Sequence, residues 1–262
     1  MRKEFSFLYI FFALIFTSGL FAQNEMAKES LFIIHEDIVK PAMVGEYESA
    51  SKELAAKLKE HNIQELNYNA ASRDDFHYIY VSKIENMAEL DSNPWKTFEE
   101  KMGKDKVEAL WNRFDKCYDS HKNFIVRRLD DLSHMPASIT ANISNLNFRH
   151  WDFYYIQPEK REEARKIAKE WKTLYESKNI QDDGYRLSFG DLGTDMPVYV
   201  TVQFAKDAAD FNAKNMKTDQ ALGEEGKALM QRTMALTRKF ESVDGWARPD
   251  LSYVPQEAMT AK

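Results

Sequence analysis

The chain has 262 residues, 44% of them hydrophobic and 30% charged, with a formal net charge of −6 at pH 7. This length allows one or two domains with a large core, and the acidic balance argues against nucleic acid as a partner, because nucleic-acid-binding surfaces are basic. Cys117 is the only cysteine, which excludes an internal disulfide bond, and an exported protein of this size can rely on its core instead.

The first 22 residues have the pattern of a secretory signal peptide. Arg2 and Lys3 precede an apolar run from Phe5 to Phe16, and small residues then lead to Ala22. This pattern is typical of a leader that is removed on export, and the apolar run is shorter than the roughly 20 residues of a membrane-spanning helix. We expect residues 1–22 to be cleaved, no membrane span in the remainder, and a periplasmic or extracellular protein.

The next segments predict a strand, a helix, two strands, a second helix and a last strand. Aromatic and β-branched residues in "SLFIIHEDIVK" predict the first strand. Pro41 suits the start of the helix that follows, because its missing N–H costs little there. "ELNYNA" and "DFHYIYVSKI" predict two strands joined by a turn. A helix with Val107, Leu110 and Phe114 on one face then leads to the strand "NFIVRRL".

The second half of the chain repeats this order. Pro158 matches Pro41 at an offset of 117 residues, and the helices that follow both end in "NIQ". "YVTV" from Tyr199 matches "YIYV" from Tyr78 at an offset of 121, and "DLSYVP" matches "DLSHMP" at an offset of 119. Matches in the same order at nearly constant offsets indicate a duplicated unit.

Each unit has the ferredoxin-like order β-α-β-β-α-β. Such a sheet carries helices on one face and leaves the other bare, and two bare faces can pack together and shield their edges. The predicted fold class is α+β, with two tandem units packed sheet to sheet as a barrel within one chain. We assign the first unit to residues 23–136, a polar linker to residues 137–147 and the second unit to residues 148–262.

The duplicated unit, its helix lengths and the strand that follows the linker resemble the dimeric α+β barrel superfamily. Within it, the chain is most similar to NIPSNAP-like and antibiotic-biosynthesis-monooxygenase-like proteins, here fused in tandem. The resemblance covers nearly the whole mature chain. It implies a fold shared by cofactor-free monooxygenases, haem-handling enzymes and small-ring isomerases, and therefore no single activity. No relative's catalytic motif matches residue by residue.

Alternation along the strands separates two side-chain faces. One mostly apolar face is expected beneath the helices, and it comprises Phe32, Ile34, Ile38, Ile79, Val81, Arg149, Trp151, Tyr155, Val200 and Val202. The other is expected to point into the barrel, and its candidate ligand-binding residues are His35, Asp37, Tyr78, Tyr80, His150, Asp152, Tyr154 and Tyr199. Buried polar groups need partners, so this face predicts a hydrogen-bond network that fixes how the halves dock, a ligand pocket or a catalytic site.

Other chemistry has less support in the sequence. The six histidines include no HExxH motif and no close pair, so no metal ligands are predicted. Cys117 has no catalytic signature around it. Cys117 and His121 are expected at core positions, because they match Leu236 and Phe240 in the second unit.

Three functions remain open. The first is an exported barrel of undefined activity that binds a small molecule or a partner in or around the barrel. The second is a cofactor-free monooxygenase or a haem-handling enzyme, with His35 or His150 as base or axial ligand, Asp37 or Asp152 orienting it, and tyrosines holding an aromatic substrate. The third is a structural subunit. The sequence requires no cofactor, although haem is compatible, and the chain is expected to be a monomer or a homodimer.

Overall fold

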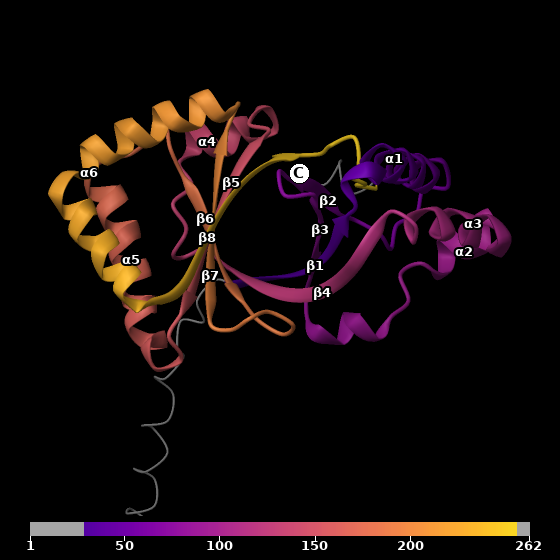
Figure 1. The fold of residues 1–262 in the computed structure, drawn as a ribbon, viewed down its shortest axis with the longest axis horizontal. Helices are drawn as coiled ribbons and strands as arrows, with labels where there is room; N and C mark the ends of the chain where they lie inside the picture. The colour runs from indigo at the N-terminus through magenta and orange to yellow at the C-terminus, as the bar shows by residue number, and fades with distance from the viewer. Residues whose placement is uncertain (1–28, 256–262) are drawn as a thin grey trace, which may run out of the picture.

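Eight antiparallel strands form a closed barrel, and helices cover it on two opposite sides (Figure 1). The computed structural model describes residues 29–255, and the expected signal peptide lies outside them. The first half contains β1 (Glu29–Val39), α1 (Val44–Glu60), β2 (Asn69–Arg73), β3 (His77–Ile84), α2 (Lys96–Met102), α3 (Lys104–Phe114) and β4 (Tyr118–Leu129). The second half contains β5 (Phe148–Ile156), α5 (Arg161–Ser177), β6 (Tyr185–Gly190), β7 (Val198–Ala205), α6 (Ala208–Leu236) and β8 (Thr237–Ala247). A short helix, α4 (Ala137–Asn142), lies in the predicted linker.

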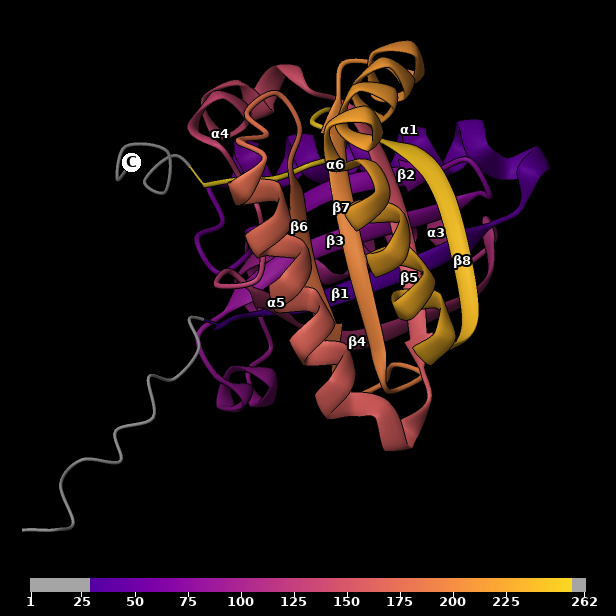
Figure 2. The ribbon, with the colours of Figure 1, turned by 90° about the vertical axis from the view of Figure 1, so that its left-hand side faces the viewer.

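Each half has the strand order of a ferredoxin-like sheet. The order is β4-β1-β3-β2 in the first half and β8-β5-β7-β6 in the second. Pairing of β2 with β8 and of β4 with β6 closes the barrel. Helices α5 and α6 lie across the outer face of the second sheet, as Figure 2 shows, and α1 to α3 lie on the opposite side of the barrel. The predicted fold is therefore confirmed. Within residues 29–255, none of the helices combines the length and apolar character that a bilayer span requires.

The repeated "NIQ" ends α1 and α5 in the same way. Asn62 and Asn179 have positive φ angles of 46° and 52°, a conformation that asparagine tolerates better than most residues. The next amide then donates back to the helix, in the first half from Ile63 to the carbonyl of Leu58. The predicted helix ends are confirmed.

Some elements of the first half differ from their expected bounds, and β4 begins at Tyr118 instead of at residue 123. β2 begins at Asn69 instead of at residue 65, because Tyr68 pairs with Tyr253 near the end of the chain. The predicted second helix corresponds to α3. Gly103, whose φ of 92° is one that glycine adopts without strain, separates it from α2, which was not predicted.

The first copy of "DLSxxP" crosses from the end of β4 onto the second half. Leu132 is buried in the core beneath α5 and α6. His134 pairs with Tyr185 at the start of β6, and its Nε2 lies 2.8 Å from the carbonyl oxygen of Ile180. Ser133 Oγ accepts a hydrogen bond from the amide of Leu187. This segment belongs to the first half in sequence but packs against the second half.

The second copy makes the reciprocal crossing, from the end of β8 onto the first half. Leu251 is fully buried in the core beneath α1 and α3. Tyr253 pairs with Tyr68 and donates from its hydroxyl to the carbonyl of Ile63. Ser252 Oγ accepts from the amide of Ala70, as Ser133 does in the other crossing. The repeated segment thus ties each half to its twin.

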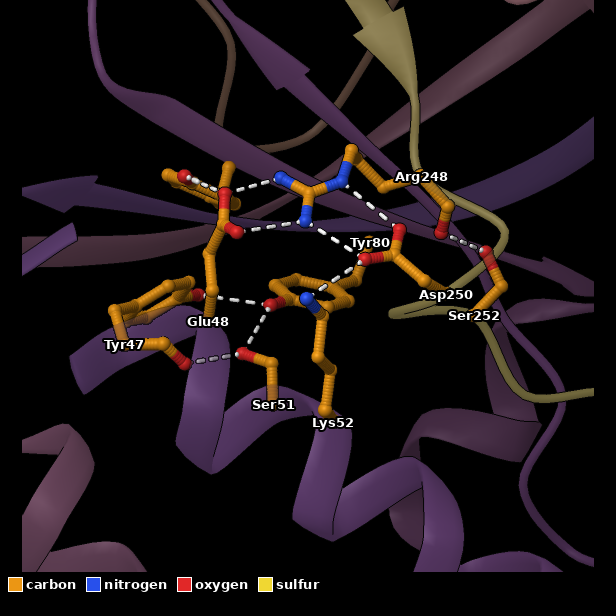
Figure 3. A network of polar contacts seen from close by, with 9 residues as sticks. Tyr47, Glu48, Ser51, Lys52, Tyr80, Arg248, Asp250 and Ser252 are labelled. Carbon is orange, nitrogen blue, oxygen red and sulfur yellow. Dashed lines mark hydrogen bonds and ion pairs between the residues drawn. The ribbon is translucent and has the colours of Figure 1, made fainter. Parts of the chain in front are cut away.

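A charged cluster strengthens the second crossing (Figure 3). Arg248 makes two hydrogen bonds to Glu48 of α1 and two to Asp250, of 2.9 Å from Nε and 2.8 Å from Nη2. Lys52 lies 3.3 Å from the same Asp250 carboxylate. The hydrogen bonds from Arg248 lower the pKa of Glu48 and hold that of Asp250 at about 2, so both carboxylates are charged at neutral pH.

The predicted assignment of the strand faces is wrong. In the first half, Asp37 accepts a 2.5 Å hydrogen bond from Tyr47 of α1, Tyr78 donates to Glu48, and Tyr80 bonds to Ser51. Residues that lie directly opposite each other on neighbouring strands share a face of the sheet. His35 lies opposite Tyr80, so it points outward too.

The second half shows the same inversion. Tyr154 and Tyr199 belong to the core beneath α5 and α6. His150 and Asp152 lie on the outward face with them, because alternate residues of a strand share a face. The face predicted to enter the barrel therefore lies beneath the helices, and helix side chains satisfy its polar groups.

The barrel interior holds the apolar face together with charged side chains. The Arg149 guanidinium lies 4.6 Å from the centre of the Phe204 ring, and Arg186 lies 5.2 Å from the same ring. Glu36 is buried. Its Oε2 lies 2.7 Å from Lys122 Nζ, and its Oε1 lies 2.9 Å from His77 Nδ1. Burial alone would raise the pKa of Glu36, but hydrogen bonds from these two partners hold it at about 2.

We expect Leu251→Ala to lower the free energy of unfolding by about 2–5 kcal/mol, because it empties a fully buried site where the crossing segment enters the first core. Leu192→Ala is the control, since Leu192 is 63% exposed, and its effect should stay within about 0.5 kcal/mol. Urea denaturation of both variants measures the difference. Equal effects would mean that the crossing segment contributes nothing to stability.

The Arg248 cluster should also make stability sensitive to acid. A carboxyl with a lowered pKa in the folded state stabilises it fully above the unfolded pKa of about 4, and that contribution disappears as pH falls through the folded value. In Arg248→Met the pKa values of Glu48 and Asp250 should rise toward ordinary values. The variant should therefore lose less stability than the wild type between pH 5 and pH 2.5.

Urea midpoints across this pH range measure the effect, with Arg232→Met as control. Arg232 forms an exposed ion pair with Glu170 on the outer helices, and such pairs contribute little. If the urea midpoints of the wild type and Arg248→Met fall in parallel with pH, the Arg248 cluster is not the source of the acid sensitivity.

Candidate functional site

The second half contains a cavity of about 230 Å³ between its sheet and helices α5 and α6. Five aromatic side chains form much of its wall, namely Tyr154, Trp171, Tyr175, Tyr185 and Tyr199. An apolar cavity of about 150 Å³ already admits benzene. This cavity therefore has room for an aromatic ring system.

The two halves differ at equivalent positions around the cavity. Tyr47 in α1 is fully buried and fills the space beneath the helices of the first half. At the sequence offset of 117, its counterpart in α5 is Ala164, which lines the cavity. Tyr80 is likewise replaced by Thr201 at the offset of 121, again on the cavity wall. Two large side chains are thus replaced by small ones along the cavity wall, while two leucines of α1 are in turn replaced by Trp171 and Tyr175 in α5.

One end of the cavity is polar. Asp152 and Thr201 are paired across β5 and β7, and Gln203 follows on the same face of β7. Asn215 and Asp219 approach from α6, and Gln203 Nε2 donates a 3.1 Å hydrogen bond to Asn215 Oδ1. The two carboxylates can only accept hydrogen bonds when ionised. This end of the cavity therefore suits a ligand that carries hydroxyl or amine donors.

His150 holds Asp152 at the edge of the cavity. Its Nε2 lies 3.2 Å from Asp152 Oδ1, and its Nδ1 lies 2.6 Å from Asp244 Oδ1 on β8. The ring stacks on Phe211 with 4.4 Å between centroids. Burial would lower the pKa of His150, but the hydrogen bonds to Asp152 and Asp244 outweigh it and raise the pKa. His150 is therefore a positioning residue, with both nitrogens occupied.

The cavity tyrosines remain protonated at neutral pH. Burial is the main cause that raises the pKa of Tyr154, Tyr175 and Tyr185, and it also raises that of Tyr199. Their hydroxyl groups can donate hydrogen bonds, and their rings supply apolar contact area.

The equivalent region of the first half is a filled hydrogen-bond network (Figure 3). Tyr47 donates to Asp37 Oδ2, and its hydroxyl lies 3.0 Å from that of Tyr80. Ser51 lies 3.1 Å from the same Tyr80 hydroxyl. Burial raises the pKa of Tyr80 to about 12. Here α1 satisfies the polar strand face. These bonds lie within the first half and outside the barrel, so they do not dock the two halves as one of the sequence-based interpretations expected.

Beside this network, His35, Asp37 and His121 form a cluster on the outer face of β1 and β4. His35 Nε2 lies 3.1 Å and His121 Nδ1 lies 3.9 Å from Asp37 Oδ1. Asp37 and His121 are directly opposed in the strand register. His121 was expected in the core, but its side chain is 53% exposed because α3 ends before it and leaves this part of β4 uncovered. The expected burial of Cys117 is confirmed.

The eight predicted site residues thus separate into two groups. Asp152, Tyr154 and Tyr199 line the cavity, and His150 supports it. The first-half residues lie in the filled region, namely His35, Asp37, Tyr78 and Tyr80.

The sequence did not single out the helix residues that complete the site. Trp171 and Tyr175 belong to the apolar face of α5 and were treated as core. Asn215 and Asp219 lie on α6, where polar residues usually indicate a solvated surface. A comparison of helix positions between the repeats would have revealed the replacement of Tyr47 by Ala164. That signal indicates missing volume in the second half.

Comparisons with known proteins show likeness at the level of structure. No family model matches the chain, and no curated protein matches it. A solved structure of an anthrone oxidase-like protein superposes with a TM-score of 0.56 at 12% identity, covering 84% of this chain and 91% of its own. The solved structure of a candidate monooxygenase from Lactobacillus acidophilus NCFM has a TM-score of 0.50 at 8% identity. The match covers 84% of this chain and 94% of that one. A second candidate monooxygenase, from Fusobacterium nucleatum subsp. nucleatum, has a TM-score of 0.50 at 12% identity. The match covers 83% of this chain and 92% of that one.

These structures share the closed barrel and its helices with the chain described above. The chain therefore has the dimeric α+β barrel fold, with both halves supplied by one polypeptide. At such low identity the likeness establishes the fold alone.

We expect the pKa of His150, followed by NMR titration of its ring protons, to lie above the ordinary value of about 6.5. Asp244→Asn should lower it, because one of the two carboxylates that stabilise the imidazolium is removed. The charged form contributes stability below the unfolded pKa, and this contribution is lost as pH rises through the folded value. His61, at the end of α1, is the internal reference. An unchanged His150 pKa in Asp244→Asn would contradict the pairing.

Proposed function

We propose that the protein binds a small, planar, hydroxylated aromatic molecule in the cavity of its second half. The observation that carries this proposal is the replacement of Tyr47 and Tyr80 by Ala164 and Thr201, which opens an aromatic-lined space on a scaffold that is otherwise filled. If the predicted leader directs export, binding takes place in the periplasm or outside the cell.

The composition of the cavity wall supports this ligand class. Aromatic side chains favour flat apolar ligands through stacking and edge contacts. Asp152 and Asp219 supply acceptors at one end of the cavity, and a phenolic hydroxyl is a matching donor. A ligand that leaves buried acceptors unpaired loses affinity. A phenol or hydroquinone therefore fits better than an unsubstituted aromatic ring.

Haem does not fit this cavity. Haem iron is held by histidine, cysteine, methionine or tyrosinate, and no histidine or cysteine is found among the described residues of the cavity wall. The nearby His150 has both ring nitrogens engaged by Asp152 and Asp244. The tyrosines keep their protons, because burial raises their pKa. Met230 lines the cavity but is 40% exposed, and we assign haem no role.

A second candidate is oxidation of the bound phenol by dioxygen without a cofactor. The named oxidase-like and monooxygenase structures that share this fold support it, and so does the position of Asp152 on the cavity wall. A carboxylate held by His150 could accept the phenolic proton. A hydroquinone would then lose two electrons and two protons to dioxygen, giving the quinone and hydrogen peroxide. Oxygen uptake in the presence of the metal-free protein and a hydroquinone, absent in Asp152→Asn, would support this candidate.

We expect 2-naphthol to raise the melting temperature of the protein and to change its tryptophan fluorescence through Trp171. Ala164→Tyr should abolish both effects, because it places in the second half the side chain that fills the first. The variant should still fold, since the first half accommodates Tyr47 at the equivalent position. Circular dichroism and thermal unfolding without ligand verify this.

Two controls separate cavity binding from adsorption. Ala228→Tyr adds the same side chain at an exposed position of α6 and should leave 2-naphthol binding unchanged. 2-Methoxynaphthalene cannot donate a hydrogen bond, so it should bind about tenfold more weakly, as expected for the loss of one hydrogen bond. Equal binding by wild type and Ala164→Tyr would refute the proposed function.

A further inference from the structure

We propose that His35, Asp37 and His121 form a binding site for a divalent first-row transition-metal ion on the outer face of the first half. The site is separate from the cavity of the second half and does not depend on the proposed function. Sequence patterns did not predict it, because the two histidines lie on different strands and become neighbours only when β1 pairs with β4.

The three side chains lie at distances that suit a shared ion. Their ligand atoms all lie within 4.8 Å of one another. Asp37 Oδ1 is nearest to both histidines, at 3.1 Å from His35 Nε2 and 3.9 Å from His121 Nδ1. Atoms that each bind one zinc ion at about 2.0–2.2 Å lie roughly 3–4 Å apart in a tetrahedral arrangement. Small side-chain rotations would therefore complete such a site.

One carboxylate oxygen in the cluster has no hydrogen-bond donor. Asp37 is 3% exposed, and its Oδ2 accepts from the hydroxyl of Tyr47 at 2.5 Å. Its Oδ1 faces the histidines and has no hydrogen bond from any described residue, because His35 Nε2 is close to it but not aligned. A buried carboxylate oxygen without a donor is costly. A metal ion would supply the missing partner.

The surroundings of the cluster orient its ligands. His35 Nδ1 lies 3.0 Å from Asn123 Oδ1. An amide oxygen only accepts hydrogen bonds, so Nδ1 carries a proton. Nε2 faces Asp37 and would give up its own proton to a metal ion, because metal ligation requires the neutral nitrogen. Metal-binding histidines almost always have such a partner on their second nitrogen. Asn123 and Tyr47 thus hold two of the three ligands from behind.

The chemistry of the donors narrows the choice of ion. Two imidazole nitrogens and one carboxylate suit zinc and its first-row neighbours better than magnesium or calcium, which prefer oxygen ligands. The side chains of His35 and His121 are 38% and 53% exposed, so an ion can enter from solvent. Three protein ligands leave positions for water, as in metal sites that act on substrates.

Isothermal titration of zinc into the untagged, chelator-treated mature chain tests the proposal. We expect saturable binding of one zinc ion per chain, with an accompanying rise in melting temperature. His35→Gln and His121→Gln should each weaken binding at least about tenfold. Asn123→Ala should weaken it by roughly 10- to 100-fold, as loss of a supporting contact does in other metal sites. Cobalt, added in place of zinc, should give visible absorption bands that disappear in the histidine variants.

His150→Gln is the matched control, because it removes a histidine that contacts aspartate in the other half. It should leave zinc affinity unchanged. Absence of one-to-one binding by the wild type would overturn the proposal and leave His35 and Asp37 as a simple ion pair. Equal zinc affinity in the wild type and the His35→Gln and His121→Gln variants would overturn it as well.

Discussion

The exchange of the two "DLSxxP" segments is the constraint on which the rest of this structure depends. Each segment leaves the last strand of its own half and buries a leucine in the core of the other, Leu132 in one direction and Leu251 in the other. The strand seams alone are short, since β2 and β8 pair over three residues and so do β4 and β6. The crossings add buried apolar area and backbone pairing at the same places. Two units that could otherwise separate are thereby held as one barrel.

Once the barrel is closed, its two outer faces are free to differ. Both halves retain the strand order, the helix ends and the crossing segment, which are the features that closure requires. The space beneath the helices is under no such requirement. In the first half Tyr47 and Tyr80 fill it and bond to Asp37 and Ser51. In the second half Ala164 and Thr201 leave it open. Duplication thus yields one half whose space beneath the helices is filled and one half with a cavity.

The polar strand faces have different partners in the two halves. In the first half, α1 contributes hydroxyl and carboxylate groups that satisfy them, and at the margin of α1 two histidines and Asp37 lie close together. In the second half, α5 contributes Ala164, Ile167 and Trp171 at the cavity wall, so Asp152 depends on His150 for support. The same alternation of polar and apolar residues therefore leads to a network in one half and to a cavity edge in the other.

The repeat, the order of the elements and the fold class could be predicted from the amino-acid sequence, because they follow from local patterns such as hydrophobic periodicity, helix-ending asparagines and the recurring "DLSxxP". The sequence also grouped polar residues such as Asp152 and Tyr154 on one face of their strand. That these residues face the helices and not the barrel interior follows from the packing of the helices, which the sequence pattern did not predict. The alternation of side chains defines two faces of a strand, but it does not show which face a helix covers. The covered face depends on contacts with side chains of the helices, such as Tyr47 of α1. The meeting of His121 with Asp37 has the same origin, since strand pairing joins residues that no local pattern connects.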